Sequence, residues 1–375
     1  MKEHAKYRTW VEIDTDAIED NTRTMKKLLS GKLLMSVVKS NAYGHGMTLS
    51  ARAVLRGGAD MLAVDDIDEA LELRREGIKA PILVLGHIIP KRFSEAVMKN
   101  ISITISSIDS LEEIMRQRFV RKPRVHIKFE TGLYRQGISE TDMNRLLSAL
   151  TSRKWNAIVE GVYTHFAAME SPSEVEYSKG QVKRFETYVK MLHERGFEPL
   201  RHMSASSGIL FSPEFHYDVA RAGIVTYGLW PSSEIRNHAH GVVLKPALSW
   251  KTIVSEVKSV KRGERVGYDL TYKLTKDSRI AVIPVGYWHG LPRALSNTGL
   301  VLLHGKYAPI IGRVSMDMTI IDVTDIKSVI AGDTVILIGT DGKSSVSAED
   351  MADKADTINY EIVTRINPLI ERIEI

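Results

Sequence analysis

The chain has no cysteine among its 375 residues, which excludes disulfide bonds and thiolate metal sites. It also has no apolar run close to the ~20 residues that cross a bilayer. Its first residues, Met1–Arg8, lack the apolar stretch of a secretory signal. From these absences we expect a cytoplasmic protein without membrane spans.

A strong excess of one charge is also missing. The 51 Lys and Arg and 46 Asp and Glu residues leave a formal net charge of +5, without a Lys/Arg tract. Nucleic-acid binding therefore has little support, and a small anion such as a phosphate ester or an amino acid carboxylate is the more natural partner. No His pair has metal-ligand spacing, and Asp341–Ser344 lacks the glycine-rich lead of a phosphate loop, so a metal hydrolase is disfavoured.

Short apolar runs alternate with amphipathic, helix-like stretches over the first two thirds of the chain. Eight runs are predicted to be strands: Leu34–Val38, Met61–Val64, Ile82–Leu85, Ile101–Ile105, Arg124–Phe129, Ala157–Tyr163, Leu200–Met203 and Tyr217–Ala220. Eight such strands over roughly 225 residues are typical of a (β/α)8 barrel of the α/β class. A doubly wound sheet is the alternative.

The pattern changes after Pro231–Ser233. From Val243 onward, polar and apolar residues alternate in short segments that Gly-, Pro- and Asp-rich turns separate. We therefore predict a (β/α)8 barrel over residues 1–238 and a mostly β C-terminal domain over residues 239–375. The first ~10 residues are a candidate for pairing with this second domain.

Lys39 is the first candidate functional residue. It follows an apolar run that starts at Leu33 and precedes a Ser/Asn/Gly cluster, so we expect it at the C-terminal end of a buried strand. Poor solvation there would lower the lysine pKa, and a neutral amine can attack a carbonyl to form a Schiff base. The alternative is an ordinary lysine that ends a strand and reaches solvent.

More polar residues are expected at the same ends of the barrel strands. They are Tyr43 after the first strand, Arg135 after the fifth, His165 after the sixth, Ser204, Ser206 and Ser207 after the seventh, and Arg221 at the eighth. Each alone has an ordinary structural role as its alternative. Together they predict one rim with cations, a histidine and a hydroxyl-rich loop near strands seven and eight, where barrels often bind phosphate.

These residues and several further motifs resemble the alanine racemase family, the fold-type III pyridoxal 5'-phosphate enzymes. The motifs are Trp10–Asp14, the Lys39 segment, Lys128–Gly132, Tyr163–Phe166, Arg221–Pro231, Val266–Tyr268, Pro284–Tyr287 and Gly312–Asp317. The resemblance covers nearly the whole chain. It implies a pyridoxal phosphate-dependent racemase that interconverts L-alanine and D-alanine, supplies D-alanine for cell-wall synthesis, and works as a homodimer with shared active sites.

The resemblance also implies two catalytic bases. Lys39 would hold the cofactor and serve the D-side of the substrate, and Tyr268 of the partner subunit would serve the L-side. A phenol needs nearby cations to act as a base, and the resemblance gives this support to His165, Arg221 and His202. Arg221 would also face the pyridine nitrogen and leave it neutral, because a guanidinium cannot accept a proton.

The remaining contacts follow from the same resemblance. The phosphate ligands would be Tyr43, Ser206 and the backbone N–H groups of Gly223 and Ile224. The substrate-binding residues would be Arg135, Met316, Tyr287 and Asp317. Arg135 would also contact the cofactor's phenolic oxygen, next to Lys128, a lysine that some relatives carbamylate. No metal site is expected.

Departures from the family pattern leave the preferred amino acid open. Ala205 replaces an Asn before the phosphate serine, Trp288 and His289 replace a small residue and an acid at the entrance, and Pro368 stands where some members have a phosphate-contacting Tyr. One methylene in a pocket changes selection only by roughly 10–200-fold. A serine or broad-specificity racemase is therefore an alternative, as are a non-catalytic pyridoxal phosphate-binding protein and a cofactor-free aldolase.

Overall fold

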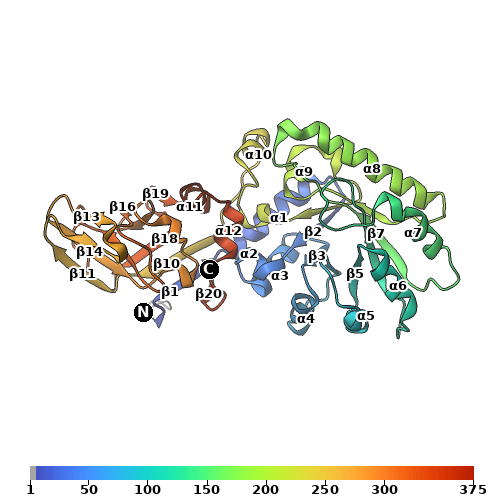
Figure 1. Cartoon of the computed structure of the whole chain (residues 1–375), viewed down its shortest axis with the longest axis horizontal. Coiled ribbons are helices and arrows are strands. Elements are labelled where there is room, and N and C mark those ends of the chain that lie inside the picture. Colours follow the sequence, from blue (N-terminus) through green and yellow to red (C-terminus); the bar gives the residue numbers. More distant parts are fainter. Residues whose placement is uncertain (1–5) are drawn as a thin grey trace. The chain divides into compact units, whose positions relative to one another are not determined.

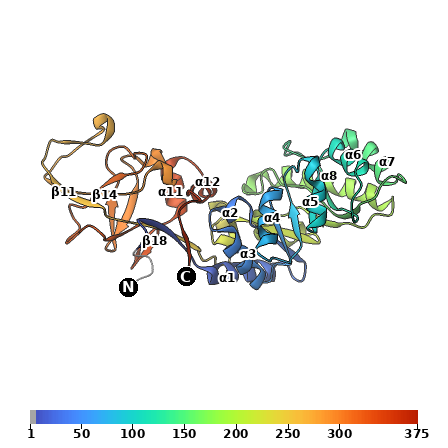
Figure 2. The same ribbon diagram turned by 90° about the horizontal axis from the view of Figure 1, so that it is seen from below.

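A computed structural model describes residues 6–375, which form two compact units (Figures 1 and 2). The larger, barrel unit comprises Asp16–Ala42 and Met47–Pro246. The smaller, β-rich unit comprises the described residues up to Thr15, Tyr43–Gly46 and Ala247–Ile375. The expected division into domains at residues 238 and 239 stays a prediction. None of the helices in residues 6–375 combines the length and apolarity that crossing a bilayer requires.

Eight parallel strands close into a barrel at the centre of the larger unit. They are β2 (Leu33–Val37), β3 (Met61–Val64), β4 (Ile82–Val84), β5 (Ile101–Ile105), β6 (Arg124–Lys128), β7 (Ile158–Tyr163), β8 (Leu200–His202) and β9 (Val219–Ala222). The last strand pairs with the first, with Leu33 opposite Val219. Every predicted barrel strand overlaps an observed one, so the barrel is confirmed and the doubly wound sheet is wrong.

Helices surround the strands of the barrel unit (Figure 1). They are α1 (Thr15–Leu28), α3 (Met47–Arg56), α4 (Ile67–Arg75), α5 (Phe93–Met98), α6 (Ile108–Arg116), α7 (Met143–Leu150), α8 (Val175–His193), α9 (Ser206–Phe211) and α10 (Ser233–His238). Their ends have local causes. Asp66 caps α4 by accepting a hydrogen bond from the backbone N–H of Glu69, and Ser107 caps α6 in the same way at Ser110.

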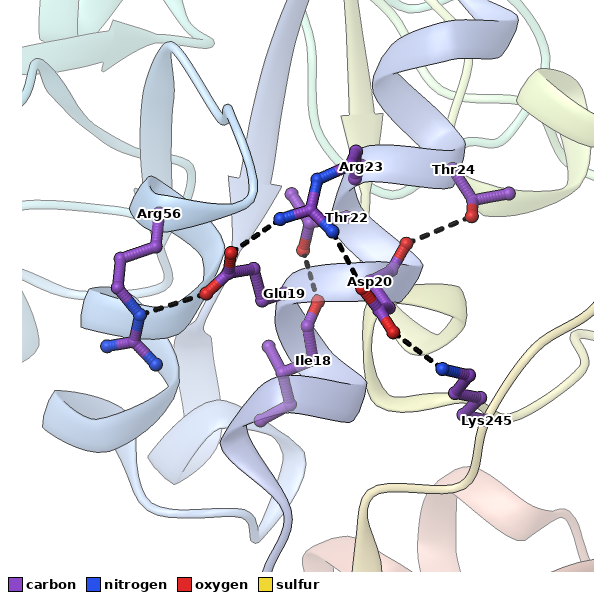
Figure 3. A network of polar contacts seen from close by, with 8 residues as sticks. All are labelled: Ile18, Glu19, Asp20, Thr22, Arg23, Thr24, Arg56 and Lys245. Carbon is purple, nitrogen blue, oxygen red and sulfur yellow. Dashed lines mark hydrogen bonds and ion pairs between the residues drawn. The ribbon is translucent and has the colours of Figure 1, made fainter.

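Ion pairs on α1 connect it with its surroundings in the barrel unit (Figure 3). Glu19 lies between Arg23, at 2.5 Å, and Arg56 of α3, at 3.0 Å. Asp20 lies between Arg23, at 2.7 Å, and Lys245, at 2.5 Å. These side chains are largely exposed, so each pair stabilises the fold by at most about 1 kcal/mol.

Most of the smaller unit is β-structure. Its strands are β1 (Thr9–Ile13), β10 (Leu248–Ile253), β11 (Glu256–Val260), β12 (Arg265–Val266), β13 (Tyr272–Lys273), β14 (Ser278–Ile283), β15 (Leu300–Leu303), β16 (Lys306–Pro309), β17 (Thr319–Asp322), β18 (Thr334–Asp341), β19 (Ser344–Val346) and β20 (Arg372–Glu374). The buried strand β1 lies between β10 and β20, so the N-terminal segment belongs to the same sheet as the last strand. Two helices, α11 (Ala348–Ala355) and α12 (Asn359–Thr364), follow β19.

Candidate active site

Lys39 lies directly after β2, at the C-terminal end of the barrel, as predicted. Its Nζ atom donates a hydrogen bond to Oδ1 of Asp65, which follows β3, over 2.9 Å. The Lys39 side chain is 35% exposed and Asp65 is 53% exposed. The expectation of a poorly solvated amine is therefore wrong for this chain, because the side chain is partly exposed and its amine contacts a carboxylate. Asp65 did not stand out in the sequence, since only the pairing of β2 with β3 brings the two residues together.

The backbone after Lys39 turns in the left-handed sense. Lys39 begins the short element α2 (Lys39–Tyr43). The φ angle is 54° at Ser40, Asn41 and Ala42 and 53° at Tyr43. Such a conformation costs roughly 1–2 kcal/mol per non-glycine residue. Glu69 opposes this cost by accepting hydrogen bonds from the N–H groups of Ser40 and Asp65. Strain of this kind is concentrated at functional sites, where the surrounding contacts hold it in place.

Arg221 lies inside the barrel and is only 3% exposed. Its Nη1 atom is 2.8 Å from Nδ1 of His202, and its Nη2 atom is 3.1 Å from Nδ1 of His165. Nη2 also donates to the carbonyl oxygens of Thr164 and Met203, each at 2.9 Å. Because arginine only donates, both histidine Nδ1 atoms must be acceptors. The structure thus brings together the three residues that sequence analysis grouped, with Arg221 within β9 rather than after it.

Both histidines are held in the neutral state. Burial, and then the charge of Arg221, lowers the pKa of His165 well below its usual value. The same two causes lower the pKa of His202 well below its usual value. Each ring therefore carries its one proton on Nε2, opposite the nitrogen that faces Arg221.

Lys128 is the desolvated lysine of this rim. It is 5% exposed at the end of β6, where burial, and then the charges of Arg135 and Arg221, lower its pKa to about 8. Its Nζ atom donates to Oε1 of Gln136 over 3.1 Å. Arg135 is exposed, yet its charge contributes to the lowered pKa values of Lys128 and His165, so it lies near both.

The hydroxyl-rich loop also meets the end of β9. Ser206 begins α9, is 4% exposed, and accepts a hydrogen bond from the backbone N–H of Gly223 over 3.0 Å. Ile224 follows Gly223 and begins a short 3-10 turn. The structure therefore places the Ser206 hydroxyl beside the backbone N–H groups at the start of this turn, and the N–H of Gly223 is occupied by Ser206. A hydroxyl and backbone N–H groups are uncharged donors that suit an oxyanion such as phosphate.

The smaller unit carries the other predicted residues. Tyr287 and Trp288 lie beside the bend at Met316. The N–H of Tyr287 donates to the carbonyl oxygen of Ser315 and that of Trp288 to the carbonyl oxygen of Met316, each over 3.0 Å. Asp317 follows and is exposed. Tyr268 begins a 3-10 turn and is 70% exposed.

The structure shows the surroundings of two departures from the family pattern. His289 is 4% exposed, accepts a hydrogen bond from the N–H of Gly286, and has a pKa lowered by burial. It therefore supports a turn with an uncharged side chain. The correspondence of Pro368 to a phosphate-contacting tyrosine stays a prediction. Another tyrosine, Tyr360 on α12, lies 6.1 Å from Tyr43 between ring centroids.

Comparisons with known proteins agree along the whole chain. The family model described as "Alanine racemase, N-terminal domain" matches residues 13–231, and "Alanine racemase, C-terminal domain" matches residues 247–374. An alanine racemase of Symbiobacterium thermophilum is 39% identical over 367 residues, 97% of this chain and 96% of the relative. An alanine racemase of Methanococcus maripaludis is 38% identical over 369 residues, 97% of this chain and 98% of the relative.

Solved structures give the same result. The alanine racemase of Bacillus anthracis with bound L-Ala-P has a TM-score of 0.92 at 37% identity, covering 98% of this chain and 95% of that one. The alanine racemase of D-cycloserine-producing Streptomyces lavendulae has a TM-score of 0.92 at 32% identity, covering 98% and 97%. The barrel, the β-rich unit and the lysine-bearing rim define a two-domain amino acid racemase, an isomerase. The chain belongs to the alanine racemase family.

Proposed function

We propose that this protein interconverts L-alanine and D-alanine with pyridoxal 5'-phosphate, the cofactor on which its family depends. The observation that carries the proposal is the rim itself, where Lys39 lies at one strand end and Arg221 is fixed between two neutral histidines. When bound, the cofactor acidifies the α-proton of an attached amino acid. Racemisation then needs a proton acceptor and a proton donor on opposite faces of the substrate.

The donor set of the rim fits this cofactor. Lys39 offers the primary amine that would hold it, and Ser206 and Ile224 would offer uncharged donors for a phosphate. The N–H of Gly223, which donates to Ser206 here, would turn to the phosphate. Arg221 would face the pyridine nitrogen. Four acceptors fix the guanidinium, and it cannot take up a proton, so it would leave that nitrogen neutral. A neutral ring nitrogen limits side reactions of the cofactor.

Lys39 would move the proton on the D-side. After it accepts the α-proton it is an ammonium, and Asp65 at 2.9 Å stabilises that charge. Tyr268 would move the proton on the L-side. Its side chain is 70% exposed within its own chain, which suits a residue that completes a site on a second subunit.

The remaining assignments concern binding. Arg135 would contact the cofactor's phenolic oxygen and the substrate carboxylate, beside Lys128. The lowered pKa of Lys128 increases the share of the neutral amine, which is the form that reacts with carbon dioxide. Tyr43 would add a phosphate contact, and Tyr360, whose ring packs against it, would hold it. Tyr287, Met316 and Asp317 would line the approach of the substrate.

A homodimer follows from these roles, since Lys39 and Tyr268 would come from different subunits. Besides Tyr268, the smaller unit exposes other large side chains, among them Leu270, Tyr287, Trp288, Met316 and Met318. Exposed apolar groups of this kind mark interaction surfaces. The D-alanine formed would supply cell-wall synthesis in the cytoplasm, a compartment that the absence of cysteine suits.

The test is a circular-dichroism racemisation assay over a panel of D-amino acids with added pyridoxal phosphate. We expect alanine to be the fastest substrate. If serine were racemised much faster than alanine, serine would be the substrate instead. If no amino acid were racemised, the proposal would be wrong. Activity without the cofactor would contradict its assigned role.

A further inference from the structure

A line of buried polar side chains continues from Arg221 into the barrel. Nε2 of His202 is 2.9 Å from Nδ1 of His126. Nε2 of His126 is 3.4 Å from Oε2 of Glu160, a contact that does not meet hydrogen-bond geometry, and this buried nitrogen has no hydrogen-bond partner among the described residues. Both histidines are fully buried, and the Glu160 side chain is 9% exposed. The four residues come from β9, β8, β6 and β7 in that order. We call this line the Arg221–Glu160 relay.

The backbone makes room for the relay. Gly161 of β7 lies against the His126 ring, and a Cβ atom added there would stand 2.3 Å from Nδ1 of His126. The rings of His126 and His202 meet edge to face, with centroids 5.1 Å apart. An alanine at position 161 would therefore displace His126, so the contact between the two histidines depends on this glycine.

The first residue of the relay fixes the direction of its two hydrogen bonds and the place of the proton that faces Glu160. Arg221 only donates, so Nδ1 of His202 is an acceptor, and the single proton of this neutral ring is on Nε2. That proton points at Nδ1 of His126, which must then accept it. The proton of His126 is therefore on Nε2, where it faces Glu160.

The last residue of the relay enforces the same direction. Burial raises the pKa of Glu160, but His126, Arg124 and Ser102 together outweigh burial and lower it well below the usual value. The carboxylate is thus ionised and can only accept. Ser102 donates to Oε2 over 2.6 Å and Nε of Arg124 donates to Oε1 over 3.0 Å. These two donors hold the carboxylate in place.

We propose that Glu160 and His126 are positioning residues for Arg221: they hold His202 in the Nε2–H tautomer, so that its Nδ1 atom stays available to the guanidinium. The inference rests on the proposed function, in which Arg221 faces the pyridine nitrogen. Neither residue touches a reacting atom. Glu160 lies in the N-terminal half of its strand, a region of such barrels that ordinarily serves stability alone.

Glu160→Gln tests the direction of the relay. Arg124 donates to Oε1, so the amide oxygen of Gln would take this place and the amide NH2 group would face His126. His126 would then accept at Nε2 and carry its proton on Nδ1, against the Nε2–H of His202. Two N–H donors would then face each other in a buried place. The Nδ1 atom of His202 could no longer be held as the acceptor for Arg221.

The double variant Arg124→Ala, Glu160→Gln separates this effect from a general loss of packing. Without Arg124 the amide can turn, so that its oxygen accepts from His126 again. Glu112→Gln is the matched control, because Glu112 also accepts from two arginines, Arg116 and Arg145, but on the exposed helix α6.

The first measurement is the histidine tautomer, read from long-range 1H–15N couplings in the protein with and without pyridoxal phosphate. We expect Nε2–H for His126 and His202 in the wild type and Nδ1–H for His126 in Glu160→Gln. A proton on Nδ1 of either histidine in the wild type would overturn the inference. This readout does not depend on activity, so it stands even if the wild type fails to racemise alanine, which would overturn the proposed function instead.

The second measurement is the split between kcat and KM. We expect Glu160→Gln to lower kcat by about tenfold, the loss of roughly one hydrogen bond to a charged group, with little change in KM. The double variant should recover most of this loss, and Glu112→Gln should match the wild type. An unchanged kcat in Glu160→Gln, or a double variant no better than the single one, would overturn the inference.

Discussion

The Nζ atom of Lys39 and the Oδ1 atom of Asp65 lie 2.9 Å apart, across the ends of two adjacent barrel strands. A carboxylate so close to an amine stabilises its charged form. In the proposed reaction Lys39 is charged after it takes the α-proton from D-alanine, so Asp65 favours that product state. Asp65 therefore joins the candidate site as a residue that sequence motifs did not indicate.

Asp65→Asn should lower kcat with D-alanine by about twofold to fivefold, because an exposed ion pair contributes at most about 1 kcal/mol. The primary isotope effect with α-deuterated D-alanine should rise, since proton transfer to Lys39 becomes slower. Asp68→Asn, which removes another exposed aspartate that pairs with an arginine, Arg92, is the control and should change neither value. An isotope effect that stays the same would contradict the assigned role of Asp65.

Tyr268→Phe should lower racemisation by about 10²–10⁴-fold, the usual contribution of a general acid or base. Lys39 remains, so exchange of the α-proton of D-alanine with heavy water should continue without inversion. Proton NMR follows the exchange, and circular dichroism follows the inversion. Tyr307→Phe, on an exposed tyrosine of the same unit, is the matched control. Equal loss of exchange and inversion would show that Tyr268 does not act on one face only.

Arg221→Lys keeps a positive charge but loses the planar group that serves His202 and His165 together. We expect kcat to fall by about 10–100-fold, as one or two hydrogen bonds of a charged group are lost. A lysine can also give up its proton, so side reactions of the cofactor should increase. Loss of the cofactor's visible absorbance during turnover measures them. Stable absorbance at reduced kcat would contradict the role given to Arg221.

Lys128 should make stability depend on pH in the alkaline range. Its pKa of about 8 in the folded state lies below the usual 10.5, so the unfolded state binds more protons between these values. Below pH 8 the buried lysine is charged, and the cost of burying that charge lowers the free energy of unfolding. The free energy of unfolding therefore increases as the pH rises from 8 toward 10.5. The gain is at most about 3 kcal/mol, from 1.36 kcal/mol per unit of pKa.

Lys128→Met should remove this dependence. Unfolding by urea in buffer free of carbon dioxide, at several pH values between 7 and 10, measures it for both proteins. The free energy of unfolding of the wild type should rise relative to that of the variant as the pH increases. A constant difference between the two proteins across this range would refute the assigned pKa.

The barrel could be predicted because its strands are short, continuous apolar runs, and such runs are buried on both faces of a parallel sheet. Helix α11 was missed among the strands of the smaller unit, although Ser347 and Asp350 form a capping box at its start. The capping box is a short, local signal, and the alternation of polar and apolar residues around it favoured strands.

Some residues of the candidate site could likewise be predicted from the sequence, and others could not. Lys39, Arg221 and His165 could be placed at strand ends from the chain alone, because the end of a strand fixes a residue's position in a barrel. Asp65 and Glu160 could not, since their roles depend on which side chains face each other across neighbouring strands. The solvation of Lys39 was misjudged for the same reason, as its partner lies 26 positions away.

The central claim is that each active site takes Lys39 from one subunit and Tyr268 from the other. Mixing inactive Lys39→Ala and Tyr268→Phe proteins under conditions that exchange subunits tests it directly. A mixed dimer then has one site with both residues intact, so activity should return to about a quarter of the wild-type value in an equal, random mixture. A mixture that stays inactive, although exchange of subunits is shown by mass, would contradict the claim.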